Sequence, residues 1–118
     1  MRTMRASAKA GGASRVVKGA VFGREPRIVR IDGVHLDLPL KGPLLITRHA
    51  DAPGVLGRIG TVLGQHGVNI RRVELGPPSD EHDGLAAGFL TLYDEPGPDV
   101  LAAIAALEPI RSVELVHL

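Results

Sequence analysis

The chain has 118 residues, a formal net charge of +1 and 44% hydrophobic residues, which fits one domain with a short appendage. Cysteine is absent, so disulfide bonds, thiolate metal sites and a cysteine nucleophile are excluded. No apolar run approaches the roughly 20 residues that a membrane-spanning helix needs, and no apolar segment follows the basic N-terminus as in a secretory signal. We therefore expect a cytoplasmic protein with no membrane partner.

The charge is distributed unevenly along the chain. Residues 1–30 carry eight basic side chains against one acidic side chain, for a net charge of +7, so the remaining 88 residues sum to −6. A basic arm can indicate nucleic-acid binding. Residues 1–14, however, contain no aromatic side chain for base stacking and show no helical or strand-like period. We expect them to form a disordered, solvated arm without a nucleic-acid partner.

A β-hairpin is predicted over about residues 27–38. Asp32 and Gly33 separate two runs in which apolar and polar residues alternate, and both residue types tolerate the positive φ angles of a type I′ turn. A hairpin alone is only marginally stable in water, so this one needs another part of the protein to pack on. Residues 15–42 are interpreted as this hairpin segment followed by a linker rich in proline and glycine.

Residues 43–118 show a regular order of elements. Strands are expected at Leu44–His49, Val68–Leu75, Leu85–Tyr93 and Ser112–Leu118, helices at about 53–66 and 98–108, and a polar turn at Gly76–Gly84. The order β-α-β-β-α-β predicts an α+β, ferredoxin-like domain with a four-stranded antiparallel sheet and both helices on one face. The other face has no helix of its own, and such faces and edges often pack against a second copy. We therefore expect a dimer.

The first of these helices has clear start and stop signals. Pro53 suits the first helical position, and Gly67 suits the left-handed position that ends a helix. An amphipathic stripe lies between them, at Val55, Leu56, Ile59, Val62 and Leu63. The same segment contains three glycines, at positions 57, 60 and 64. We expect some of these to let the helix approach the sheet closely.

The loop between the first strand and this helix has the chemistry of an amino-acid site. The N-terminus of a helix offers free N–H groups and positive potential to a carboxylate. Gly54 lets a ligand approach the backbone, and Asp51 can accept hydrogen bonds from an ammonium group. The alternative is that Asp51 only caps the helix.

The run RHADAPGVLGRIGTVLGQHGVNI resembles the signature of ACT domains. Together with the upstream stretch Gly19–Leu38, the span from Leu44 to Leu118 resembles the C-terminal regulatory region of long-form D-3-phosphoglycerate dehydrogenases, namely the end of the intervening domain plus the ACT domain. In that family serine, the pathway product of serine biosynthesis, binds at the interface between ACT domains and inhibits the enzyme allosterically. The resemblance therefore implies an amino-acid-binding regulatory module, with L-serine or another small amino acid as ligand and a homodimer as the assembly.

The resemblance also implies the contacting residues. They are the side chains of His49, Asp51 and Asn69, with the backbone at Gly54 and Val55 completing the pocket. The residues alone, without the resemblance, favour a surface position on the strand for His49 and a turn position at the start of a strand for Asn69. An ACT-like dimerisation domain, or a stand-alone sensor of another amino acid, is the alternative function.

No catalytic, cofactor or metal site is expected in this chain. The dehydrogenase needs a dinucleotide-binding G-x-G-x-x-G after a strand, whereas the glycines here cluster inside a predicted helix. An RNA-binding domain with the same order of elements would present aromatic residues on its central strands, but the first strand has none. A metal-binding domain and a small enzyme of the same fold are disfavoured because the five histidines are scattered and no carboxylate pair is placed for acid–base chemistry.

Overall fold

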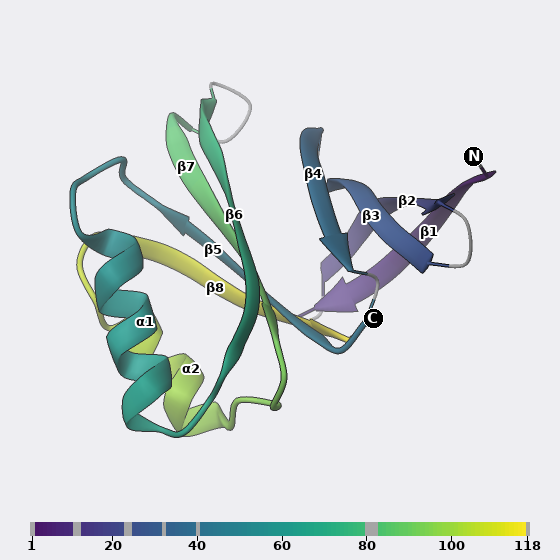
Figure 1. The fold of residues 1–118 in the computed structure, drawn as a ribbon. Helices are drawn as coiled ribbons and strands as arrows, with labels where there is room; N and C mark the ends of the chain where they lie inside the picture. The colour runs from purple at the N-terminus through teal and green to yellow at the C-terminus, as the bar shows by residue number, and fades with distance from the viewer. Residues whose placement is uncertain are drawn as a thin grey trace.

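The chain, here as a computed structural model, is described for residues 2–10, 13–22, 25–31, 33–39, 41–79 and 83–117. These residues form two four-stranded antiparallel sheets and two helices (Figure 1). The first sheet has the order β1-β2-β3-β4, with β1 at Arg2–Ala10, β2 at Ala13–Phe22, β3 at Glu25–Ile31 and β4 at Val34–Pro39. The second has the order β6-β7-β5-β8, with β5 at Pro43–His49, β6 at Ile70–Ser79, β7 at Leu85–Leu92 and β8 at Ile110–His117. The helices are α1 at Val55–Gln65 and α2 at Pro98–Ala105.

The C-terminal half has the predicted ferredoxin-like fold. Its elements follow the order β5-α1-β6-β7-α2-β8, and both helices lie on one face of the sheet (Figure 1). The core between helices and sheet is formed mainly by Leu45, Val55, Ile59, Val62, Leu63, Leu90, Leu92, Val100 and Ile104. Most of these residues come from the apolar stripe of α1 and from alternate positions of β5 and β7, as the two periodicities require.

The ends of α1 are set by two glycines in the left-handed conformation. Gly54 is the N-cap with a φ of 82°, so the helix begins at Val55. The prediction that Pro53 is the first helical position was therefore wrong. At the other end Gly67 has a φ of 71°, and the N–H of Val68 donates to the carbonyl of Leu63 at 2.9 Å. This is the Schellman arrangement, which confirms the predicted stop.

The three glycines inside α1 do not serve close packing. A Cβ at Gly57, Gly60 or Gly64 would meet no heavy atom within 4 Å outside the helix's own backbone. The prediction of a close helix-to-sheet approach at these positions was therefore wrong. The physical reason is that they lie off the buried stripe, which consists of Val55, Ile59, Val62 and Leu63.

The N-terminal region forms more structure than its sequence pattern indicated. The predicted hairpin is present as β3 and β4, with Ile31 paired to Val34 and Gly33 at a φ of 81°; Asp32 lies outside the described residues. It is half of a four-stranded meander rather than a lone hairpin. The prediction of disorder over 1–14 does not hold for Arg2–Ala10, which pair with β2 as strand β1. A segment can pair with a neighbouring strand through backbone hydrogen bonds even when its apolar and polar side chains do not alternate.

Strand β6 continues beyond its expected end. Gly76 pairs with Ala87 and Ser79 with Leu85, and the register shifts between these pairs. The predicted turn at Gly76–Gly84 is therefore strand up to Ser79. Two consecutive prolines are tolerated there because β6 is an edge strand of its sheet, where a missing N–H breaks no inner ladder.

The face of the second sheet opposite the helices is covered by the first sheet (Figure 1). A second buried cluster joins the two sheets, formed by Ile28, Ile31, Leu36 and Leu38 of the first and Leu44, Ile46, Ala87, Phe89 and Val116 of the second. The expectation that this face is bare, and therefore free to pack on a second copy, does not hold in this region. A dimer has to use an edge or another surface.

Candidate functional site

His49 ends β5 beside the loop that leads to α1. It pairs with Ala86 of β7 and Ile110 of β8, and only 7% of the residue is exposed. The Nδ1 atom lies 3.1 Å from the carbonyl oxygen of Ala50. Because a carbonyl oxygen only accepts, Nδ1 carries the hydrogen, and in the neutral ring Nε2 is left as an acceptor.

Asp51 is exposed and does not cap the helix. The N-cap of α1 is Gly54, which makes no side-chain cap hydrogen bond, and the first turn of the helix has no acidic residue. The alternative role of Asp51 as a cap is therefore contradicted. Its carboxylate remains available to a ligand, and the N–H groups at the start of α1 have no capping side chain.

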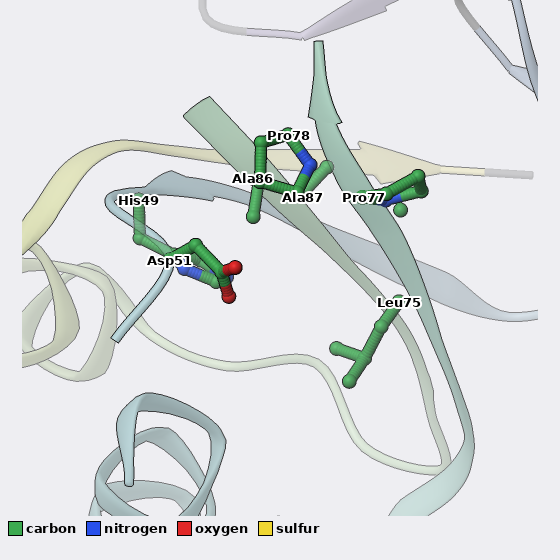
Figure 2. A pocket seen from close by; sticks show the side chains of 8 residues that line it. His49, Asp51, Leu75, Pro77, Pro78, Ala86 and Ala87 are labelled. Carbon is green, nitrogen blue, oxygen red and sulfur yellow. The ribbon is translucent and has the colours of Figure 1, made fainter. Parts of the chain in front are cut away.

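His49 and Asp51 line one side of a pocket of about 350 Å³ (Figure 2). The other residues that line it are Leu75, Gly76, Pro77, Pro78, Ala86 and Ala87. Figure 2 shows the carboxylate of Asp51 directed toward the space between it and Leu75. The pocket thus combines one anionic group and one imidazole with an apolar wall, a combination suited to a small ligand with an ammonium group.

Two of the remaining predicted residues lie close to this pocket in the chain without lining it. Gly54 and Val55 are not among the lining residues. Gly54 has a φ of 82°, which favours glycine, and has open space on its Cβ side. The side chain of Val55 is buried in the helix–sheet core, so only its backbone is suited to a ligand.

Asn69 lies at the opposite end of the sheet from His49. Its carbonyl accepts a hydrogen bond from the N–H of Tyr93 at 3.0 Å, and its own N–H donates to Asp94 at 3.3 Å. His49 pairs with Ala86, whereas β6 begins opposite Leu92. That spacing along β7 corresponds to about 20 Å. One copy of the chain therefore does not bring Asn69 together with His49 and Asp51.

The apolar wall of the pocket was missed by sequence reasoning. The sequence pattern predicts that Leu75 ends a strand and that Gly76, Pro77 and Pro78 lie in a polar turn. The signal in the sequence is that Leu75–Pro78 contains no polar side chain. Such a segment can continue the strand, because consecutive prolines are compatible with the end of an edge strand.

The described residues offer little other site chemistry. They contain no group of three or more histidine, cysteine, aspartate or glutamate residues that could hold a metal ion. None of the helices in this part of the chain is long and apolar enough to cross a membrane.

The family model of the ACT domain matches residues 44–109, which is more than half of the chain. The chain belongs to the ACT domain family. ACT domains are regulatory domains, and no catalytic domain is evident in the part of the chain that the structure describes.

Relatives that match 78–93% of this chain are D-3-phosphoglycerate dehydrogenases. The enzyme of Archaeoglobus fulgidus is 34% identical over 110 residues, which cover 93% of this chain and 21% of the relative. That of Mycobacterium tuberculosis H37Rv is 40% identical over 112 residues, with 92% and 21% covered. That of Bacillus subtilis is 32% identical over 92 residues, with 78% and 17% covered. The chain therefore spans about a fifth of these enzymes, in their C-terminal ACT region, and the predicted resemblance is confirmed.

Proposed function

We propose that this chain is the amino-acid-binding regulatory part of a D-3-phosphoglycerate dehydrogenase in serine biosynthesis, and that its ligand is L-serine. The observation that carries this proposal is the pocket in which the Asp51 carboxylate and the His49 ring face one space. Asp51 binds the ammonium group, and Nε2 of His49 accepts from the ammonium or the hydroxyl. The backbone N–H groups at Gly54 and Val55 bind the carboxylate at the start of α1.

The position of Asn69 requires a second copy of the chain in this proposal. Strand β6 is an edge strand, and Leu75 on it is a large apolar side chain with 57% exposure. Two β6 strands that pair antiparallel about a two-fold axis bring the start of one beside the end of the other. Because Pro77 and Pro78 donate no N–H, such pairing is confined to about residues 70–76 and centres near Val73. Asn69 of one copy then reaches the Pro77 side of the other copy's pocket.

Regulation in this arrangement is linkage between ligand binding and the pairing of two copies. A ligand held by His49 and Asp51 of one copy and Asn69 of the other stabilises the paired state. It shifts an attached enzyme only by its differential affinity for the enzyme's two states. The measurable consequence for this chain alone is a dimer that becomes more stable when ligand is added.

One observation favours a second candidate function, a sensor of a different amino acid. The wall opposite His49 and Asp51 is formed by Leu75, Pro77 and Pro78. An aliphatic side chain buries apolar area against such a wall, whereas a hydroxymethyl group gains little there. If the pocket binds no amino acid at all, the remaining function is a dimerisation domain.

Thermal melting of the purified chain against a panel of amino acids at millimolar concentration tests the proposal. A ligand that binds only the native state raises the free energy of unfolding by about 2.7 kcal/mol when its concentration is 100 times its Kd. For a domain of this size, that corresponds to an increase of several degrees in the melting temperature. We expect a shift with L-serine, together with a larger dimer fraction in analytical ultracentrifugation. A shift with valine or leucine alone supports the second candidate. No shift with any amino acid leaves a dimerisation domain.

A further inference from the structure

Gly76 lies between the pocket and the N-terminal sheet. It lines the pocket, and a Cβ on it would lie 3.2 Å from Cγ1 of Val34, 3.4 Å from Cε2 of Phe89 and 3.5 Å from Cβ of Ala87. Ala87 also lines the pocket and belongs to the core that joins the two sheets. The side of the pocket wall that faces away from the pocket is thus the surface on which β4 packs.

The wall itself has few backbone bonds to hold it. The register of β6 against β7 shifts between Gly76 and Ser79, and Pro77 and Pro78 have no N–H to donate. Strand β6 is also an edge strand, so among the described strands it has a neighbour on one side only. Where the ladder is irregular, the position of a backbone segment depends on packing. Here the heavy atom nearest to the Cβ position of Gly76 is Cγ1 of Val34.

We propose that Val34 is a positioning residue for the pocket, and that its contact with Gly76 holds the wall formed by Gly76–Pro78 at the distance a ligand requires. Ligand affinity therefore depends on the N-terminal sheet, although the described lining of the pocket includes no residue of that sheet. By linkage, a ligand that fixes the wall also stabilises the packing of the two sheets. The affinity part of this inference rests on the proposed function, whereas the positioning of the wall does not.

A double-mutant cycle on the full 118-residue chain tests this proposal. Val34→Ala removes Cγ1, which lies 3.2 Å from the Cβ position of Gly76, and Gly76→Ala adds a Cβ that crowds that atom. The double variant fits the new methyl group into the space left by Val34. Val34→Thr keeps an atom at the Cγ1 position and serves as the conservative variant. Val116→Ala is the control, because it removes two methyl groups from the buried cluster on which the partly buried Val34 packs. Val116 is not among the three atoms nearest to the Cβ position of Gly76.

Two measurements separate positioning from stability. One is the Kd for L-serine by calorimetry at 25 °C. The other is amide hydrogen exchange at Gly76 and Ala87 without ligand. We expect each single variant to weaken serine binding by about fivefold or more, with faster exchange at Gly76 in Val34→Ala. We expect the double variant and Val34→Thr to recover most of the affinity, and Val116→Ala to lower the melting temperature without changing either measurement.

The proposal is overturned if Val34→Ala changes exchange at Gly76 and serine affinity no more than Val116→Ala does. Absence of recovery in the double variant also overturns it. If the unmodified chain binds no serine, the proposed function fails, and exchange at Gly76 in the ligand-free variants still decides whether Val34 positions the wall. Should Val34→Ala not fold, the comparison of Gly76→Ala with the double variant and with Val34→Thr replaces it.

Discussion

Thr47 of β5 and Gly88 of β7 face each other directly, and a Cβ on Gly88 would lie 2.7 Å from Oγ1 of Thr47. Leu90 closes the same space, with its Cδ1 at 3.5 Å from that Cβ. Thr47 is completely buried. Residue 88 therefore has to be glycine for a steric reason, since the neighbouring hydroxyl occupies the place of its side chain.

The first prediction follows from this contact. Gly88→Ala should destabilise the chain by about 1–3 kcal/mol, the usual range when an extra group is forced into a packed core, as measured by urea denaturation. Adding Thr47→Ala should recover part of that loss because it removes the crowding oxygen. Equal stability of Gly88→Ala and the unmodified chain would show that β5 and β7 can separate at this point without loss.

The second prediction concerns the hydroxyl of Thr47. Its Oγ1 is buried and has no hydrogen-bond partner among the described residues, and a buried polar group without a partner costs about 1–3 kcal/mol. Thr47→Val replaces the hydroxyl with a methyl group of similar size. We expect unchanged or higher stability, by up to about 1 kcal/mol. A loss of stability would mean that the hydroxyl bonds to a water molecule.

The third prediction contrasts two glycines. Gly57 is an exposed residue inside α1 with open space around it, so Gly57→Ala should stabilise the chain by about 0.5–1 kcal/mol. Gly42 has a φ of 80°, and a Cβ there would lie 3.0 Å from the carbonyl oxygen of Leu92. Gly42→Ala should therefore destabilise the chain by about 1 kcal/mol or more. Thermal melting of the two variants should give shifts of opposite sign, and shifts of the same sign would contradict the contrast.

The fourth prediction concerns Asp51. Because it does not cap α1, Asp51→Ala should change stability by less than about 0.5 kcal/mol and abolish the shift in melting temperature that serine produces. Asp99→Ala is the matched control, since Asp99 is an exposed aspartate in the first turn of α2 and should leave the serine shift intact. A large drop in stability for Asp51→Ala without ligand would mean that the carboxylate has a structural role.

The fifth prediction concerns the N-terminus. A disordered, solvated arm over residues 1–14 would be dispensable for folding and binding. Strand β1 pairs along its length with β2 and contacts β8, so we now expect a chain lacking residues 1–12 to melt at a lower temperature. The amides of β2 should exchange faster, whereas the helix signal in circular dichroism should persist. Unchanged melting and exchange would restore the interpretation of a solvated arm.

The sequence alone determined the order of elements in the C-terminal half, the end of α1 at Gly67, the hairpin around Gly33 and the resemblance to ACT domains. These features depend on interactions close in the chain, such as the apolar stripe of one helix or the backbone conformation of one glycine. Helix-forming and turn-forming patterns of this kind are readable without knowledge of the neighbouring elements.

Other features were decided only by the tertiary structure, because they depend on which segments meet in space. Residues 2–10 lack an alternating pattern and become a strand because β2 lies beside them. The face opposite the helices is covered because apolar residues of β3 and β4 pack on it, and Val34 reaches Gly76 through that packing. Asn69 and His49 belong to one family signature in the sequence, yet the antiparallel strands β6 and β7 place them at opposite ends of the sheet. Strand pairing and the packing between sheets join residues that are distant in the chain. The hydrophobic period of one segment does not show which other segment it packs against.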